Sequence, residues 1–242
     1  MTRIALLALL AFIPATENDP RLTVHTIVRE DIFAGYMVKD MVRLARGEAM
    51  LEQLDKERPE QRQHVRAWQG GAATFRAVLA YERGDRAEGG RLYSAGQSRF
   101  DEALKLGPND GGVWAVIATV NGLFADRLPV EARVAAWNTA YDFYRKLGAQ
   151  QMATMDKLPS HFKGELLAGL VMSAQRTGHQ EEFTVALDRM IELTENTPYS
   201  RTAKTWKETP ESVAHSSLLC KNCHESGRLE ARKKTARNPP QR

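Results

Sequence analysis

Apolar residues recur every three or four positions along nearly the whole chain of 242 residues, which is the period of an α-helix. No segment shows the strict alternation of apolar and polar residues that is typical of a half-buried strand. The sequence therefore predicts an all-α protein without a sheet. The stripes behind this prediction are Phe33, Met37, Met41 and Leu44; Val65, Trp68, Ala72, Phe75 and Leu79; Leu92, Gly96, Phe100 and Ala103; Val113, Ile117, Val120 and Phe124; Val130, Val134, Trp137, Tyr141 and Tyr144; Leu166 or Leu167, Leu170 and Ala174; and Phe183, Leu187 and Met190.

Short turn sequences separate these helices. Three contain glycine or proline where a helix must stop: Arg83-Gly84-Asp85, Gly107-Pro108-Asn109-Asp110 and Thr177-Gly178-His179. Because such short loops join amphipathic helices, we expect stacked antiparallel helix hairpins. Thr209 and Pro210 have the residue types of an N-cap and a first helical position, so a further helix is predicted to begin near Pro210 and to run toward residue 224.

Two hairpins carry part of a tetratricopeptide pattern. The segment from Phe100 to Asn109 has an aromatic residue, a small residue three positions later and a proline that closes the helix. A looser copy consists of Gly178, Phe183, Leu187, Met190 and Pro198. Because the first helices depart from the pattern and the spacing is irregular, we expect residues 22–200 to form a degenerate helical-repeat domain without a fixed repeat count.

Residues 220–224 read Cys-Lys-Asn-Cys-His, the C-x-x-C-H sequence to which c-type haem is attached, and they hold both cysteines of the chain. On a helix, Cys220, Cys223 and His224 share one face because they are three and four positions apart. The two thiols can add to the two vinyl groups of a porphyrin, and the imidazole can bind the iron as proximal ligand. We therefore predict one covalent haem c on a segment of residues 206–230.

Other interpretations of the two cysteines fit less well. A dithiol redox site of the C-x-x-C type normally follows a strand, and no strand is predicted there. A zinc site made of His215, Cys220, Cys223 and His224 would contain two adjacent ligands, which suits zinc-finger spacings poorly. A disulfide across two intervening residues would stabilise the chain little. Haem is the prediction, and zinc is the first alternative.

The N-terminus has the layout of a secretory signal peptide over residues 1–15. A charged start ends at Arg3, an apolar run extends from Ile4 to Ile13, and Pro14-Ala15 precedes a polar segment. The run is short for a bilayer, since a spanning helix needs about 20 residues. We predict cleavage after Ala15, and thus a periplasmic or otherwise extracytoplasmic protein without a transmembrane span in the mature chain. The alternatives are a buried N-terminal helix and an uncleaved anchor.

Composition and charge limit the partners. Apolar residues make up 43% and charged residues 26% of the chain, as in an ordinary globular protein, and the formal charge of +4 gives no reason to expect nucleic acid. Basic residues nevertheless dominate from Arg228 onward, where Glu230 is the single acid. We expect residues 231–242 to form a disordered basic tail. This tail, or the helical surface, is the predicted docking site for a redox partner protein.

Four segments carry a resemblance to a known class of proteins: Val28 to Gly35, Phe124 to Pro129, Leu166 to Leu170, and the C-x-x-C-H sequence with its trailing Gly227-Arg228-Leu229. With them, the chain resembles bacterial exported proteins that combine tetratricopeptide-like helices with a single C-x-x-C-H near the C-terminus. The resemblance spans most of the mature chain. It implies a helical haem protein but does not imply a particular activity.

The sixth ligand of the iron has to come from upstream, because only 18 residues follow His224 and they include neither Met nor His. The arrangement resembles cytochromes of the four-helix-bundle type, in which a distal methionine comes from the first helix. Methionines at helical spacing are mostly core residues. His215 is nearest in sequence and is the first distal candidate; a five-coordinate iron and a ligand from another subunit are the alternatives. The methionine candidates are Met37, Met41, Met50, Met152, Met155 and Met172.

The predicted function is electron transfer by one haem, with the helices as a docking scaffold. The sequence contains no nucleophile elbow, phosphate-binding glycine loop or H-E-x-x-H, so we expect an electron carrier or a binding protein rather than an enzyme. One alternative is a helical-repeat adaptor with a structural or sensory haem, and another is a haem enzyme or gas-binding protein with open iron. The remaining histidines are interpreted as surface or helix-end residues: His25, His64, His161 and His179.

Overall fold

The structure, a computed structural model, describes residues 22–216 and Gly227. These residues form nine α-helices and four short 3-10 helices, and no strand occurs among them. The all-α prediction is therefore confirmed for the described part of the chain. The elements are α1 (Val24–Val38), α2 (Met41–Glu57), η1 (Pro59–Gln61), α3 (Arg62–Glu82), α4 (Arg86–Leu106), α5 (Gly111–Phe124), η2 (Ala125–Arg127), α6 (Val130–Gln151), η3 (Met152–Lys157), α7 (Ser160–Thr177), α8 (Gln180–Leu193), α9 (Pro198–Glu208) and η4 (Pro210–His215).

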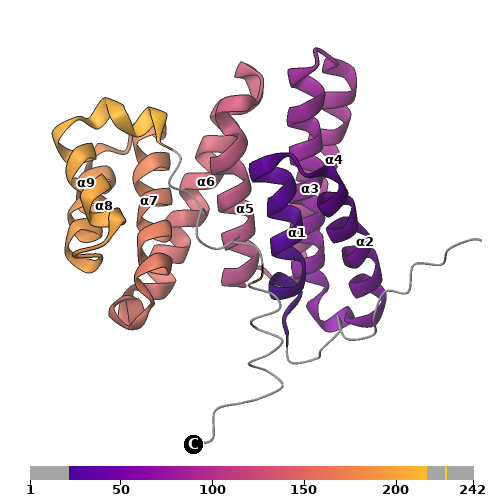
Figure 1. Cartoon of the computed structure of the whole chain (residues 1–242), viewed down its shortest axis with the longest axis horizontal. Helices are drawn as coiled ribbons and strands as arrows, with labels where there is room; N and C mark the ends of the chain where they lie inside the picture. The colour runs from indigo at the N-terminus through magenta and orange to yellow at the C-terminus, as the bar shows by residue number, and fades with distance from the viewer. Residues whose placement is uncertain (1–21, 217–226, 228–242) are drawn as a thin grey trace, which may run out of the picture.

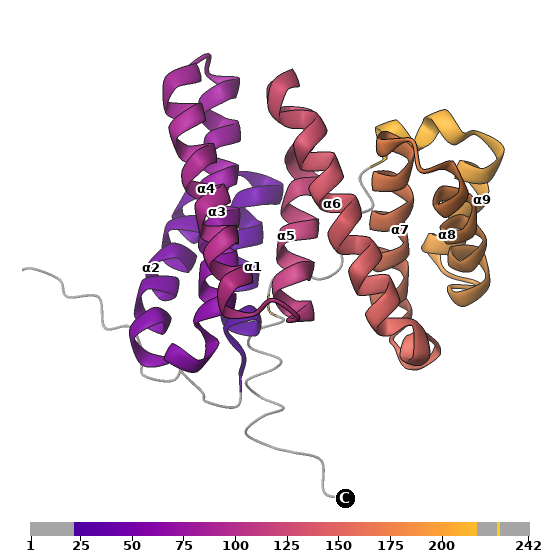
Figure 2. The same ribbon diagram turned by 180° about the vertical axis from the view of Figure 1, so that it is seen from behind.

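Neighbouring helices pack in antiparallel pairs, as the short loops predict. Helix α3 lies against α4, α5 against α6 and α7 against α8, and α1 also packs against α2. The pairs follow one another along the long axis of the molecule, from α2 and α4 at one end to α9 at the other (Figure 1). The view from behind shows the same order, with α5 and α6 between the first helices and α7 (Figure 2). The apolar stripes of successive pairs thus meet in a shared core.

Left-handed glycines and aspartate caps make the predicted turns. Gly84 and Gly178 have φ angles of 82° and 78°, a conformation that costs little only when the residue has no Cβ. The carboxylates of Asp85 and Asp110 accept hydrogen bonds from backbone N–H groups in the first turns of α4 and α5. These turns reverse the chain within a few residues, so neighbouring helices become antiparallel.

The helix predicted from Pro210 is different in the structure. Pro210–His215 form the 3-10 helix η4, and Ser216 already has extended backbone angles (φ −85°, ψ 145°). Thr209 forms no side-chain cap hydrogen bond, and Val213 is the one buried residue of η4. A segment with so little buried apolar surface and no cap has little to stabilise a longer α-helix. The prediction of an α-helix that begins at Pro210 and leads into the C-x-x-C-H sequence is therefore wrong for residues 210–215.

Two of the apolar stripes are wrong in part. Met37 and Met41 are 40% and 36% exposed, because the chain turns between them at Lys39, whose φ of 56° is left-handed. The two methionines belong to different helices, so their spacing does not put them on one buried face. Val130 and Val134 are also exposed, in the first turns of α6. No helix among the described residues combines the length and the apolar character that a membrane span requires.

Candidate functional site

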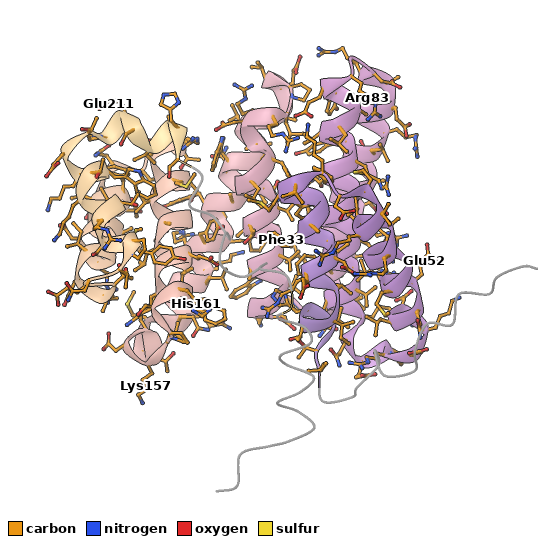
Figure 3. All side chains as sticks on the ribbon, in the orientation of Figure 1. Phe33, Glu52, Arg83, Lys157, His161 and Glu211 are labelled. Carbon is orange, nitrogen blue, oxygen red and sulfur yellow. The ribbon has the colours of Figure 1, made fainter. Side chains whose placement is uncertain are left out.

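An apolar cavity of about 380 Å³ lies between five helices. Its volume falls within the range of small-molecule and cofactor sites, roughly 300–1,000 Å³. Phe33 on α1 and His161 at the start of α7 lie on the two sides of α5 (Figure 3). Phe33 and Phe162, the residue next to His161, both line the cavity, so its walls come from both halves of the molecule. Helices α1, α3, α5, α6 and α7 contribute Phe33, Trp68, Val116, Leu147 and Phe162 to these walls, in that order.

Helix α1 is fixed at its N-terminal end, and this places one wall of the cavity. The hydroxyl of Thr23 caps the helix by accepting a hydrogen bond of 3.2 Å from the backbone N–H of Thr26. The backbone N–H of Val24 donates to Oε1 of Gln61, just before α3, at 3.0 Å. The first turn of α1, which contains His25, is therefore held beside the start of α3.

Two glycines of α7 shape the opposite wall. A Cβ at Gly169 would overlap the ring of Tyr144 on α6, and a Cβ at Gly164 would overlap the ring of Tyr199 on α9. Because both positions lack a side chain, α7 packs closely against its neighbours on two sides. Tyr144 lines the cavity, so Gly169 determines how far this ring can withdraw from it.

His25 lines the cavity and lies against Trp68, with ring centroids 5.1 Å apart and planes tilted by 53°. Burial lowers the pKa of His25 from its ordinary value of 6.5 to about 4, and the positive charges of Arg29 and His64 contribute to the same shift. No hydrogen bond joins either ring nitrogen of His25 to another described residue. The ring is therefore neutral at pH 7, the form in which imidazole binds metals.

The other polar groups at the cavity are engaged with one another or with neighbours. The hydroxyl of Tyr144 donates to Oγ1 of Thr119 at 3.4 Å. The hydroxyl of Tyr199 donates at 3.4 Å to Oε1 of Glu165, whose side chain lies at the cavity. Apolar walls with a neutral imidazole among them fit a flat and largely apolar cofactor that carries a metal ion.

The predicted haem-attachment residues Cys220, Cys223 and His224 lie outside the described residues, so their roles stay predictions. His215 is described; it is exposed at the end of η4 and does not line the cavity. Among the described residues, no group of three or more His, Cys, Asp or Glu side chains is arranged to hold a metal ion. The zinc alternative also stays untested, because three of its four residues are not described.

The two described residues that flank the C-x-x-C-H sequence belong to segments anchored on different helices. On one side, η4 is held to α7 by Arg176, whose Nη2 donates to the carbonyl of Ala214 at 2.8 Å. On the other side, the backbone N–H of Gly227 donates to Oε1 of Glu30 on α1 at 3.0 Å. Helices α1 and α7 both line the cavity, but Arg176 lies ten positions after Leu166, the last lining residue of α7.

None of the six candidate methionines lines the cavity. Met155 and Met172 are buried in the helical core, as methionines at helical spacing usually are. Met37, Met41 and Met152 are exposed. His25, predicted to be a surface or helix-end residue, does lie in the first turn of α1, but it also lines the cavity, which the sequence does not predict.

A usable signal for His25 was present in the sequence. The resemblance to four-helix-bundle cytochromes predicts a distal ligand from the first helix, and that prediction names only methionines. His25 lies in the first turn of that helix, two positions after its cap, Thr23. The cavity that His25 lines is formed by segments far apart in the chain. The spacing of apolar residues along the sequence does not reveal contacts between such segments.

No protein-family model, curated protein or solved structure matches the chain. The resemblance to exported tetratricopeptide-like haem proteins therefore stays a prediction.

Proposed function

We propose that the protein is an exported mono-haem c-type cytochrome-like protein that acts in electron transfer. Cys220 and Cys223 would form the two thioether bonds, and His224 would bind the iron as proximal ligand. One observation carries this proposal: residues 220–224 have the C-x-x-C-H sequence to which c-type haem is attached, and they hold both cysteines of the chain.

The attachment chemistry requires only the two thiols and the two vinyl groups. Each S–H adds across one C=C bond, so that sulfur bonds to one carbon and hydrogen to the other, and no atom is lost. When bound, the haem supplies an iron whose charge changes by one electron. The residues of this chain would bind, orient and shield it.

Aromatic side chains are the main binding groups in this proposal. Phe33 and Trp68 meet edge to face, with ring centroids 5.8 Å apart, and Trp68 is almost fully buried. Such a pair presents a rigid apolar surface to a planar ligand. Apolar walls also keep water from the metal and so influence its reduction potential.

The helix pairs support the second part of the proposal, a docking scaffold. We propose that residues 22–200 form a degenerate tetratricopeptide-like repeat on which a redox partner protein docks, with the basic tail of residues 231–242 as a further contact. The antiparallel pairs α3 with α4, α5 with α6, and α7 with α8 are the features of such a repeat that the fold contains. Export after cleavage at Ala15 would bring the chain to the compartment in which c-type haem is generally attached.

The same helix pairs favour a second candidate, a helical-repeat adaptor in which the haem is structural or sensory. The two candidates differ in what the haem is needed for. A Cys220→Ala/Cys223→Ala variant that still folds and captures the same partner protein as the wild type supports the adaptor. Loss of electron exchange with that partner, while binding persists, supports the electron carrier.

The first test is a pyridine haemochrome spectrum of the full chain, expressed with its signal peptide in a host that matures c-type cytochromes. The protein is extracted with acid acetone before the measurement. Haem that stays with the polypeptide and shows a thioether-type α-band supports the proposal, provided that the Cys220→Ala/Cys223→Ala control loses its haem. A polypeptide without covalent haem contradicts it.

A further inference from the structure

We propose that the cavity between α1, α3, α5, α6 and α7 binds an uncharged aromatic molecule of about two fused rings that carries one hydroxyl group. All the residues on which this inference depends are described in the structure, so it does not rest on the proposed function. A haem seated against the same aromatic walls would compete with this ligand, and the test is therefore made on a haem-free chain.

The volume of the cavity sets the size of the ligand. An apolar cavity of about 150 Å³ binds benzene. The cavity in this protein, at about 380 Å³, has more than twice that volume, so it has room for two fused rings and a small substituent. Small-molecule sites are typically apolar in this way, with a few polar groups that fix the orientation of the ligand.

The walls of the cavity favour an aromatic ligand. Phe33 and Trp68 line it from α1 and α3, with ring centroids 5.8 Å apart, and Tyr144 and Phe162 line it from α6 and α7. Rings that pack edge to face or with an offset attract one another beyond the burial of apolar surface. The hydroxyl of Tyr144 is bonded to Oγ1 of Thr119 at 3.4 Å, which holds this ring in the wall.

The charges near the cavity favour an uncharged ligand. Glu165 is the one acid among the described lining residues, and no Lys or Arg is among them, so an anion would meet a carboxylate and no cation. Near His25, the positive charge of Arg29 contributes to the low pKa of the imidazole, and it would repel a cationic ligand in the same way. A charged group without a partner is costly to bury in apolar surroundings.

The imidazole of His25 is the group that would bind the hydroxyl. Neither of its ring nitrogens is hydrogen-bonded to a described residue. The residue keeps part of its surface accessible, although burial lowers its pKa, so we infer that the accessible part faces the cavity that it lines. The neutral ring has one N–H and one lone pair, and a hydroxyl both donates and accepts, so it suits either tautomer.

The ring of His25 is also restricted before any ligand binds. Its centroid lies 5.1 Å from that of Trp68, and Trp68 is almost fully buried. The first turn of α1 is fixed by the cap at Thr23 and by the bond from Val24 to Gln61. A group restricted in this way loses little conformational freedom when it forms a hydrogen bond to a ligand.

The test uses the full-length Cys220→Ala/Cys223→Ala chain, which has no thiol to hold a haem covalently. Isothermal titration calorimetry at pH 7 measures the affinities of naphthol, naphthalene and naphthoate. We expect naphthol to bind about three- to tenfold more tightly than naphthalene, which is the net effect of one hydrogen bond. The anionic naphthoate should bind at least about tenfold more weakly than naphthol, because its charge would find no cation in the cavity.

Variants of the same chain test where the probes bind. His25→Phe keeps a ring in the wall but has no hydrogen-bonding nitrogen, so its affinities for naphthol and naphthalene should agree within about twofold. Val116→Phe enlarges a side chain that lines the cavity and should weaken the binding of both probes at least about tenfold. His161→Ala is the matched control, because His161 precedes Phe162 without lining the cavity itself, and its affinities should be unchanged.

Far-ultraviolet circular dichroism verifies that the helices persist in each variant. The order of the three affinities needs no substitution in the cavity, so the test remains decisive if Val116→Phe does not fold. Three results would overturn the proposal: naphthol that does not bind, naphthoate that binds as tightly as naphthol, or a preference for naphthol that persists in His25→Phe. The haemochrome test of the proposed function fails separately, because no covalent haem is involved in this titration.

Discussion

The backbone N–H of Gly227 donates a hydrogen bond of 3.0 Å to Oε1 of Glu30, across 197 positions of sequence. The same carboxylate oxygen accepts a bond of 3.1 Å from Nη2 of Arg43 on α2. Glu30 therefore joins α1, α2 and the residue three positions after His224. This contact returns the C-terminal segment to the helix that carries Phe33 and His25.

Replacing Glu30 by Ala should lower the free energy of unfolding by about 1–2 kcal/mol, because two hydrogen bonds to a largely buried carboxylate are lost. Urea denaturation measures this change, and limited proteolysis should cut the C-terminal segment faster. Glu52→Ala is the matched control, because Glu52 is exposed on α2 and should change stability by less than about 0.5 kcal/mol. Equal effects of the two substitutions would contradict the anchoring role.

Gly169→Ala should destabilise the protein by about 1–3 kcal/mol, because the added Cβ overlaps the ring of Tyr144. Gly148→Ala on α6 is its counterpart. A Cβ at Gly148 meets no atom within 4 Å, so alanine there should stabilise the helix by about 0.5–1 kcal/mol. Thermal unfolding of both variants is the measurement, and a melting temperature that moves in the same direction in both would refute the packing argument.

Phe162→Ala should lower the reduction potential of a haem in the cavity and change global stability little. Phe162 is 43% exposed and lines the cavity, so its removal admits water to the cofactor and favours the more highly charged oxidised iron. Spectroelectrochemical titration measures the potential. Val185→Ala, on the exposed surface of α8, is the control and should leave the potential unchanged. An unchanged potential in Phe162→Ala would place the haem elsewhere.

The haem-free Cys220→Ala/Cys223→Ala variant should lose stability as the pH falls from 6.5 to 4. The pKa of His25 is about 4 in the folded chain and 6.5 in its ordinary state, so the unfolded chain binds more protons across this window. The free energy of unfolding therefore rises as the pH goes from 4 to 6.5, by at most about 3 kcal/mol. Above pH 6.5 the contribution of His25 is constant. Chemical denaturation at several pH values measures the slope. Adding His25→Asn should flatten it, and a slope that persists would assign it to other groups.

Helix pairs and turns could be predicted because their causes are local. Gly84, Gly178 and the aspartate caps each act within a few residues, and the sequence displays them directly. Met37 and Met41 were misplaced for a local reason as well, since the turn between them uses Lys39 in a left-handed conformation that glycine normally adopts. A turn that contains neither glycine nor proline leaves the three- and four-residue spacing of apolar residues unbroken, so the sequence does not reveal it.

The cavity could not be predicted, because its walls come from segments that are distant in the sequence. His25 and Phe162 face the same space only after α1, α5 and α7 have packed, and nothing in the neighbourhood of His25 distinguishes it from a helix-end residue. The attachment sequence, by contrast, is recognisable from five residues. The sequence therefore predicts a cofactor, whereas the residues that line the cavity become visible only in the fold.

Because each helix packs against its neighbour in sequence, the helix pairs can fold one after another in chain order. A chain that emerges from synthesis or export N-terminus first can complete each hairpin as it appears, without waiting for distant partners. The last residue that lines the cavity is Leu166, more than fifty positions before Cys220. The cavity can therefore assemble before residues 220–224 emerge.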